Sequence, residues 1–183
     1  MITILVIVGI IVILGLIFAA MYNGLIRLRN KVENAWAQID VQLKRRFDLI
    51  PNLVETVKGY AAHERETLDA VITARNAGMN ASGPQDKAAA DNMLTGALKS
   101  VFALSEAYPD LKANQNFLNL QEELTSSEDR ISYARQFYND SVNRYNTKIQ
   151  TFPTAAIAGM FNFTHREYFE AEGDARGPVK VQF

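Results

Sequence analysis

Residues 25–61, LIRLRNKVENAWAQIDVQLKRRFDLIPNLVETVKGYA, determine the fold of this chain. Their apolar side chains recur at steps of three or four residues: Leu25, Leu28, Val32, Trp36, Ile39, Leu43, Phe47, Ile50, Val54, Val57 and Ala61. Such steps place side chains on one face of an α-helix. The stripe keeps its phase across Pro51, although an interior proline costs about 3 kcal/mol. The pattern therefore predicts a helix kinked at Pro51, or two nearly coaxial helices.

An uncharged segment precedes this stripe. Residues 2–22, ITILVIVGIIVILGLIFAAMY, contain no Asp, Glu, Lys or Arg. As a helix they would extend about 31 Å, close to the ~30 Å hydrocarbon thickness of a bilayer. A cleaved signal peptide would carry a basic residue before a shorter apolar run, and no Lys or Arg precedes this one. We expect a membrane anchor that continues almost directly into the stripe, with Gly24 as the weak point.

The flanks and faces of this span carry two further signals. Arg27, Arg29 and Lys31 follow it, whereas no basic residue precedes it. By the positive-inside rule the chain after the span lies in the cytoplasm, with a periplasmic location as the alternative. Gly15 and Ala19 have the spacing at which small residues let membrane helices pack closely. Ordinary small residues of a membrane helix would show the same spacing.

Helical patterns fill most of the remaining chain. The first continues through HERETLDAVITARNA to a Gly- and Asn-rich connection at residues 76–86, and the second covers residues 85–107. Pro109 ends the second helix, and Asp110 is a candidate cap for the next. The last long helix is expected from residue 111 to 150. It contains two Tyr-Asn pairs seven residues apart, Tyr138-Asn139 and Tyr145-Asn146, before Phe152-Pro153.

These patterns predict an all-α protein: a single N-terminal transmembrane helix followed by an antiparallel bundle of three to four long helices. Strand-like alternation occurs only in the terminal VKVQF. We assign residues 1–26 to the transmembrane anchor, 27–155 to the helical bundle and 156–183 to a C-terminal extension.

Composition narrows the range of functions. Nineteen basic and twenty acidic residues give a formal net charge of −1, which argues against nucleic-acid binding. The chain has no cysteine, so thiolate metal sites and a cysteine nucleophile are excluded. The histidines, His63 and His165, belong to no Glu-x-x-His or HExxH motif, and no glycine-rich phosphate loop occurs. We therefore expect no enzyme activity, no catalytic residues, no cofactor and no metal.

One charged cluster invites a functional interpretation. Arg45, Arg46 and Asp48 stand just before Pro51. As surface charges they would form pairs such as Arg45 with Asp48, worth about 0.2–0.5 kcal/mol each, and both arginines would face outward. As a functional site, the cluster and the bend would instead contact a neighbouring chain. We favour the solvated surface and keep these four residues as candidate interaction residues.

Two neighbouring features complete the candidates. Pro51 leaves the carbonyl of Phe47 without its helical donor, and an arginine or Asn52 could supply one. Trp36 lies on the apolar stripe, where a core or interface anchor is a more common role than ligand stacking. Trp36 is therefore a further candidate interaction residue.

Several long segments resemble the LemA family of bacterial membrane proteins. They are RNKVENAWAQIDVQLKRRFDLIPNLVETVKGYAAHE, ITARN, NFLNLQEEL, EDRISYARQFYNDSVNRYN and the later FP. The resemblance spans roughly residues 1–170 and includes the N-terminal span. It implies a LemA-type bundle on one anchor in the bacterial inner membrane, facing the cytoplasm. It brings no catalytic motif whose residues could be transferred.

Expectations about partners follow from the anchor and the resemblance. The first partner is the lipid bilayer. A helix that passes from membrane to bundle fixes orientation before association, which favours a homo-oligomer and a scaffolding role. LemA genes often neighbour genes for membrane metalloproteases or TPM-type proteins. The resemblance therefore implies, as the alternative, an adaptor or regulator of a membrane metalloprotease.

Overall fold

A computed structural model describes residues 1–170 and shows an all-helical chain. The helices are α1 (Ile2–Lys58), α2 (Arg65–Asn80), α3 (Gly83–Ser105), α4 (Pro109–Lys112), α5 (Gln115–Gln150) and α6 (Thr154–Met160). No strand occurs among these 170 residues. The predicted fold class, a long apolar N-terminal helix followed by a helical bundle, is confirmed. The VKVQF segment lies outside the described residues.

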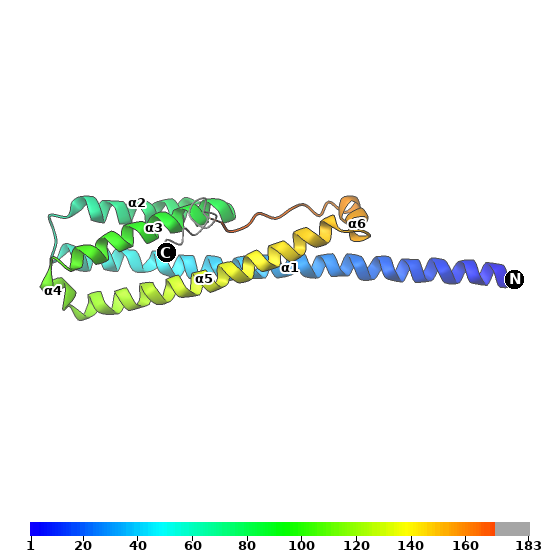
Figure 1. Cartoon of the computed structure of the whole chain (residues 1–183), viewed down its shortest axis with the longest axis horizontal. Helices are drawn as coiled ribbons and strands as arrows, with labels where there is room; N and C mark the ends of the chain where they lie inside the picture. Colours follow the sequence, from blue (N-terminus) through cyan, green and yellow to red (C-terminus); the bar gives the residue numbers. More distant parts are fainter. Residues whose placement is uncertain (171–183) are drawn as a thin grey trace, which may run out of the picture. The chain divides into compact units, whose positions relative to one another are not determined.

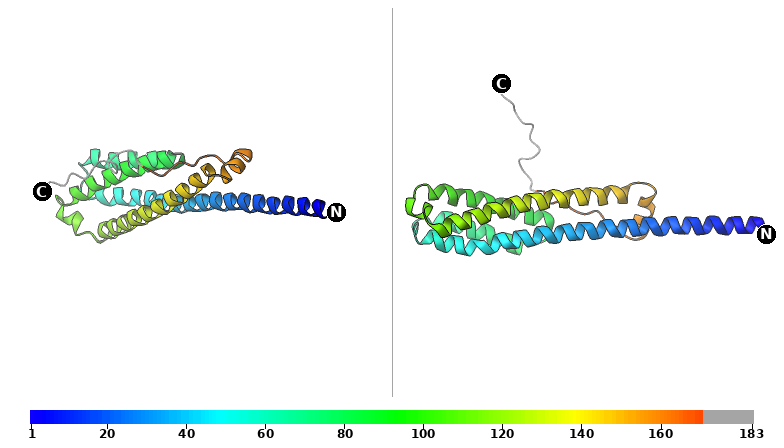
Figure 2. Two further views of the ribbon diagram at one scale, coloured as in Figure 1. Left: turned by 45° about the vertical axis from the view of Figure 1, so that its right-hand side comes forward. Right: turned by 90° about the horizontal axis from the view of Figure 1, so that it is seen from below.

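The chain forms two compact units, and α1 and α5 contribute to both. The first unit comprises Met1–Asp40 with Tyr133–Glu167, and the second comprises Val41–Ser132 with the described residues 168–170. In the second unit, the later part of α1, α2, α3 and the first part of α5 lie side by side (Figures 1 and 2). The predicted domains are consecutive segments of the sequence, whereas each compact unit combines segments that are far apart in it. The predicted domain boundaries therefore stay a prediction.

Helix α1 follows the predicted stripe without interruption. It runs through Gly24 and includes Pro51 within its length. The stripe forms part of the buried core, and its fully or almost fully buried members are Leu25, Val32, Ile39, Leu43, Phe47, Ile50, Val54, Val57 and Ala61. Burial of each large aliphatic or aromatic side chain contributes roughly 1.5–3 kcal/mol. This burial, rather than local propensity, explains why the helix tolerates an interior proline.

The expectation that the first helical pattern continues past residue 62 is wrong. Helix α1 ends at Lys58, and α2 begins only at Arg65. Gly59 follows the last helical residue, and the amides of Tyr60 and Ala61 both donate to the Val57 carbonyl. Two amides on one carbonyl close the last turn of α1 and replace the regular helical hydrogen-bond pattern. The chain can therefore fold back, and α2 packs against α3 (Figure 1).

The later helices begin and end close to the predicted positions, with one correction. Helix α5 starts at Gln115, and the separate short helix α4 precedes it. The N-terminal cap of α5 is Asn114, whose side-chain oxygen accepts a hydrogen bond from the Phe117 amide at 3.0 Å. Asp110, the predicted cap, lies inside α4. An Asn cap satisfies an amide that the first helical turn leaves without a partner.

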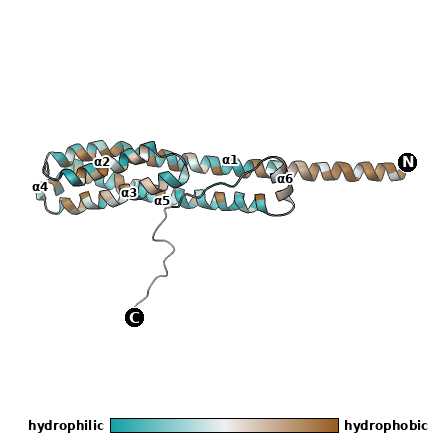
Figure 3. Ribbon diagram, turned by 90° about the horizontal axis from the view of Figure 1, so that it is seen from above, coloured by the Kyte–Doolittle hydropathy of each residue, from teal (hydrophilic) through white to brown (hydrophobic). Residues whose placement is uncertain are grey.

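After α6, the chain of the first unit turns back along α5. Asn162 has a φ of 53°, a left-handed conformation that asparagine tolerates better than most residues. Residues 163–167, here called the strap, then continue without regular secondary structure. Figure 3 shows that brown, hydrophobic residues dominate the N-terminal part of α1, whereas α5 is largely teal.

Candidate functional site

The N-terminal part of α1 has the surface of a membrane span. It is the one helix among residues 1–170 that is long and apolar enough to cross a bilayer, and its most apolar window has no buried residue. Leu5, Ile11 and Leu16 are each more than 60% exposed. Apolar exposure on this scale is stable in hydrocarbon and not in water. The chain is therefore a membrane-anchored helical protein.

The basic residues after the span differ in their surroundings. Arg27 is exposed, whereas Arg29 and Lys31 are partly covered. The Arg29 guanidinium lies 5.5 Å from the centre of the Phe163 ring, and the Lys31 ammonium lies 5.3 Å from that of Phe137. These are cation–π distances. Positive charge is thus held close to the end of the span.

Arg46 is the centre of a buried polar cluster in the second unit. Its Nη1 donates to Asp91 Oδ1 of α3 at 2.6 Å, and its Nη2 lies 2.5 Å from Glu128 Oε2 of α5. Nη2 also donates to Thr95 Oγ1 at 3.0 Å, and that hydroxyl donates to Glu128 at 3.2 Å. Charge-assisted bonds of this length are the strong class of hydrogen bond. One side chain of α1 therefore joins α3 and α5.

The expectation that Arg46 faces outward is wrong, because only 2% of its surface is exposed. The physical reason is its spacing: Arg46 lies three residues after Leu43 and four before Ile50, so it shares their face. Helix α1 packs against more than one helix here, and a buried arc wider than the apolar stripe includes position 46. The spacing of Arg46 could have predicted its burial, but a stripe defined by apolar residues alone leaves Arg46 out.

The other two charges of the cluster lie at the surface. Arg45 Nη2 is 3.9 Å from Glu123 Oε2, and both side chains are about half exposed. Asp48 pairs with Lys44 at 3.1 Å, one helical turn earlier, rather than with Arg45 as expected. Such exposed pairs contribute about 0–1 kcal/mol. The structure therefore divides the predicted cluster into one buried residue and two solvated ones.

Pro51 leaves a carbonyl that another helix satisfies. The Phe47 carbonyl is the acceptor that an amide at position 51 would serve, and Arg75 Nε of α2 donates to it at 3.2 Å. The donor is thus neither an arginine of the Arg45–Arg46 cluster nor Asn52, as expected, but Arg75 of α2. The Phe47 ring lies so close to Gly78 of α2 that a Cβ added there would stand 2.3 Å from its Cζ. Around Pro51, α1 and α2 are therefore joined by this hydrogen bond and by the close packing of the Phe47 ring against Gly78.

Trp36 and the strap both contact α5 in the first unit. The rings of Trp36 and Tyr138 lie 5.5 Å apart, so Trp36 packs inside this unit against α5. Its role as an interaction residue stays a prediction. The Tyr138 hydroxyl donates to the Glu167 carbonyl at 2.9 Å, and the Tyr145 hydroxyl donates to the Thr164 carbonyl at 3.0 Å.

Asn146 completes the attachment of the strap. Its amide nitrogen donates to the Arg166 carbonyl at 2.8 Å, and its amide oxygen accepts from the Arg166 backbone N–H at 2.9 Å. The side chain thus pairs with the strap as a neighbouring β-strand would. The predicted Tyr-Asn pairs were the sequence signal: Tyr138, Tyr145 and Asn146 are three of their four members.

Burial also perturbs the two tyrosines. Desolvation of the phenolate raises the pKa of Tyr138 to about 12, against a smaller lowering effect of Arg166. Burial likewise raises the pKa of Tyr145, with Arg166 and Arg29 opposing it. Both hydroxyls therefore stay protonated, and able to donate to the strap, at neutral pH.

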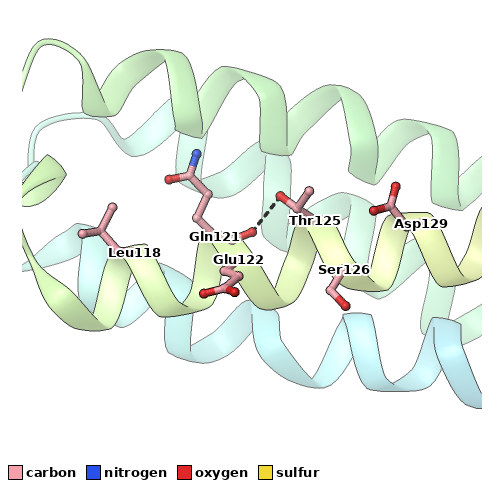
Figure 4. A pocket seen from close by; sticks show the side chains of 6 residues that line it. All are labelled: Leu118, Gln121, Glu122, Thr125, Ser126 and Asp129. Atoms are coloured by element: carbon pink, nitrogen blue, oxygen red, sulfur yellow. Dashed lines mark hydrogen bonds between the residues drawn. The ribbon is translucent and has the colours of Figure 1, made fainter.

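A shallow pocket of about 480 Å³ lies along α5 in the second unit. Its lining residues all come from this helix: Leu118, Gln121, Glu122, Thr125, Ser126 and Asp129 (Figure 4). The side chains spread along the helix and do not converge on one point, and Thr125 bonds locally to the Gln121 carbonyl at 2.8 Å. Within residues 1–170, no group of three or more His, Asp and Glu side chains could hold a metal ion.

A membrane anchor carrying a helical bundle defines the general class of this protein, and comparison with known proteins defines its family. The LemA family profile matches residues 35–183. Protein LemA of Metamycoplasma hominis is 29% identical over 159 residues, which cover 85% of this chain and 71% of that protein. Magnetosome protein MamQ 2 of Paramagnetospirillum magneticum is 24% identical, with 86% and 68% covered. MamQ of Magnetospirillum gryphiswaldense is 23% identical over the same shares. The chain belongs to the LemA family, which confirms the resemblance.

Proposed function

We propose that this protein is a non-enzymatic scaffold that self-assembles at the bacterial inner membrane through its single anchor and its helical bundle. The observation that carries the proposal is the unbroken helix α1, which runs from Ile2 to Lys58. The same helix provides the membrane span and the central apolar stripe. No flexible linker separates the span from the stripe.

A continuous helix favours lateral assembly for an entropic reason. Association normally costs several kcal/mol of rotational and translational freedom. An anchored chain has already lost much of this freedom, and a rigid connection to the span also limits the orientations that the first unit can adopt. Weak side-by-side contacts can then suffice for a homo-oligomer.

Two surfaces support such contacts. In the span, a Cβ added at Gly9 or Gly15 would meet no atom within 4 Å, so the face near Ala19 is open to a neighbouring helix. On α5, Tyr133 is 78% exposed and Phe137 is 39% exposed one turn later. Aromatic residues are enriched in protein interfaces.

The side of the membrane follows from charge. Arg27, Arg29 and Lys31 flank the C-terminal end of the span and favour a cytoplasmic bundle, with a periplasmic bundle as the alternative. The predicted partners are the lipid bilayer and further copies of the chain. A membrane metalloprotease or TPM-type protein is the partner under the alternative function, an adaptor or regulator of that protease.

Extraction of the tagged full chain from native membranes into lipid nanodiscs tests the proposal. Its measurements are the mass of the particle and the identity of every protein in it. A discrete homo-oligomer is the expected result. A membrane protease present at a fixed ratio would favour the adaptor function instead, and a monomer without partners would contradict both.

A matched pair of variants makes the test specific. Gly15→Ile and Tyr133→Asp each alter one proposed contact surface, and loss of the oligomer in either variant would identify the surface that holds it. Val41→Asp, on an exposed face of α1, is the control that should leave the particle mass unchanged.

A further inference from the structure

The segment that follows α5 and contains α6 exposes large apolar side chains. Phe152 is 91% exposed, Met160 is 70% exposed and Phe161 is 46% exposed. Residues 151–164 contain no charged side chain. We call residues 151–163 the α6 corner. An uncharged, apolar surface of this kind typically marks contact with another molecule or with a membrane.

The α6 corner lies beside the end of the membrane span. The Phe161 ring is 4.8 Å from the Tyr22 ring and 6.0 Å from the Phe18 ring, between centres. Phe163 lies 5.9 Å from Tyr22 by the same measure. Figure 3 shows α6 next to α1 where the brown, hydrophobic part of α1 ends.

This position has a defined depth in a bilayer. Residues 2–22 as a helix fill the ~30 Å hydrocarbon layer, so Phe18 and Tyr22 lie where hydrocarbon meets headgroups. Phe161 contacts both and must lie at the same level. Aromatic side chains are favoured at this boundary.

Charges around the α6 corner suit a headgroup layer. Arg29 lies against Phe163. Lys148 precedes the uncharged segment and Arg166 follows it. Arg166 also pairs with Glu33 at 3.2 Å. Basic side chains close to an apolar surface are typical of segments that lie on anionic membranes.

We propose that the α6 corner is a second membrane contact, with Phe152, Met160 and Phe161 inserted among the lipid headgroups beside the span. The partner is the bilayer surface itself. The contact requires the membrane anchor but holds on either side of the membrane and in any oligomeric state. It would fix the tilt of the first unit, because the chain then meets the bilayer at two places.

The absence of natural cysteines allows a direct test on the full chain. Phe152→Cys and Met160→Cys are each labelled with a nitroxide and reconstituted into vesicles of phosphatidylcholine with a minority of phosphatidylglycerol. Met93→Cys, at a 55% exposed position of α3, is the matched control. Collision of the label is measured with dissolved oxygen, which concentrates in lipid, and with a water-soluble nickel chelate present on both sides.

Labels at positions 152 and 160 should collide with the chelate severalfold less than the label at position 93, and more with oxygen. Chelate collision equal to that of the control at both positions would overturn the proposal. Dilution with unlabelled protein examines whether a second copy covers the corner. Shielding accompanied by spin–spin broadening that disappears on dilution would assign the corner to that copy and overturn the lipid contact.

Discussion

Arg75 Nε donates to the Phe47 carbonyl at 3.2 Å, the acceptor that Pro51 leaves without a helical partner. Hydrogen bonds from charged groups contribute about 1.5–3 kcal/mol. We expect Arg75→Met to destabilise the fold by about that amount, and by less in a Pro51→Ala background, where residue 51 regains its amide donor. Chemical denaturation in micelles, followed by circular dichroism, measures both changes.

Pro51→Ala alone should give a folded and more stable protein, by up to ~3 kcal/mol, with unchanged oligomer size. The control for Arg75→Met is Arg65→Met, at the exposed start of α2, which should change stability by less than about 0.5 kcal/mol. Equal effects of Arg75→Met in both backgrounds would show that the two residues are not coupled.

Arg46 should matter far more than its neighbour Arg45. Loss of one partner from a buried ion pair typically costs about 3–5 kcal/mol, because the remaining charge stays buried and uncompensated. We expect Arg46→Met to reach this range and Arg45→Met to stay within about 0.5 kcal/mol. The double variant Arg46→Met with Asp91→Leu should recover much of the loss. Equal denaturation midpoints for the two single variants would contradict the observed burial.

Gly78 should not tolerate a methyl group. The added Cβ would stand 2.3–3.0 Å from three atoms of the Phe47 ring, and overpacking of this kind costs about 1–3 kcal/mol. Gly96 in α3 has open space, so Gly96→Ala should stabilise the protein by up to about 1 kcal/mol through helix propensity. The two substitutions should therefore change the free energy of unfolding in opposite directions. Stabilisation by both substitutions would mean that α1 and α2 can separate at this point.

Tyr138 should weaken the fold when it ionises. Its folded-state pKa is about 12, above the ordinary value of 10, so its contribution is fully present below pH 10 and is lost as the pH rises through about 12. The absorbance of tyrosinate near 295 nm, taken as the difference between the wild type and Tyr138→Phe, should show a midpoint close to pH 12. A midpoint near pH 10 would contradict the burial of its hydroxyl.

The membrane side can be examined directly. Because Arg27, Arg29 and Lys31 flank only the C-terminal end of the span, protease added to intact spheroplasts should leave the bundle uncut. Lysed spheroplasts provide the control for protease access. Cleavage in intact spheroplasts would place the bundle in the periplasm.

Apolar spacing predicted α1 well, because a helix in constant phase buries the stripe from Leu25 to Val57 on one face. It did not predict the turn after Lys58, where Gly59 is the only local signal and tertiary contacts decide. Asn114 Nδ2 donates to the Tyr60 hydroxyl at 2.8 Å, and Tyr108 donates to Glu64 at 3.0 Å. Such contacts join residues 44 to 54 positions apart and leave no periodic trace.

The candidate site was predicted less well than the fold. Arg46 was grouped with Arg45 because both are charged, although Arg46 is buried against Asp91 and Glu128 whereas the pair of Arg45 with Glu123 is about half exposed. The strap was missed because backbone carbonyls accept its hydrogen bonds, and these acceptors are the same for every amino acid. The Arg166 backbone N–H, which donates to Asn146 Oδ1, is equally independent of sequence, so only the side chains on α5 depend on sequence.

The aromatic contact of Tyr22 with Phe161 and the cation–π contact of Arg29 with Phe163 occur on one uninterrupted helix. Each residue inserted between Tyr22 and Arg29 would turn one contact relative to the other by about 100° and shift it by about 1.5 Å. Insertions or deletions in this stretch should therefore be harmful one residue at a time. Seven residues together, close to two full turns, would restore the angle but move the span by about 10 Å along its axis.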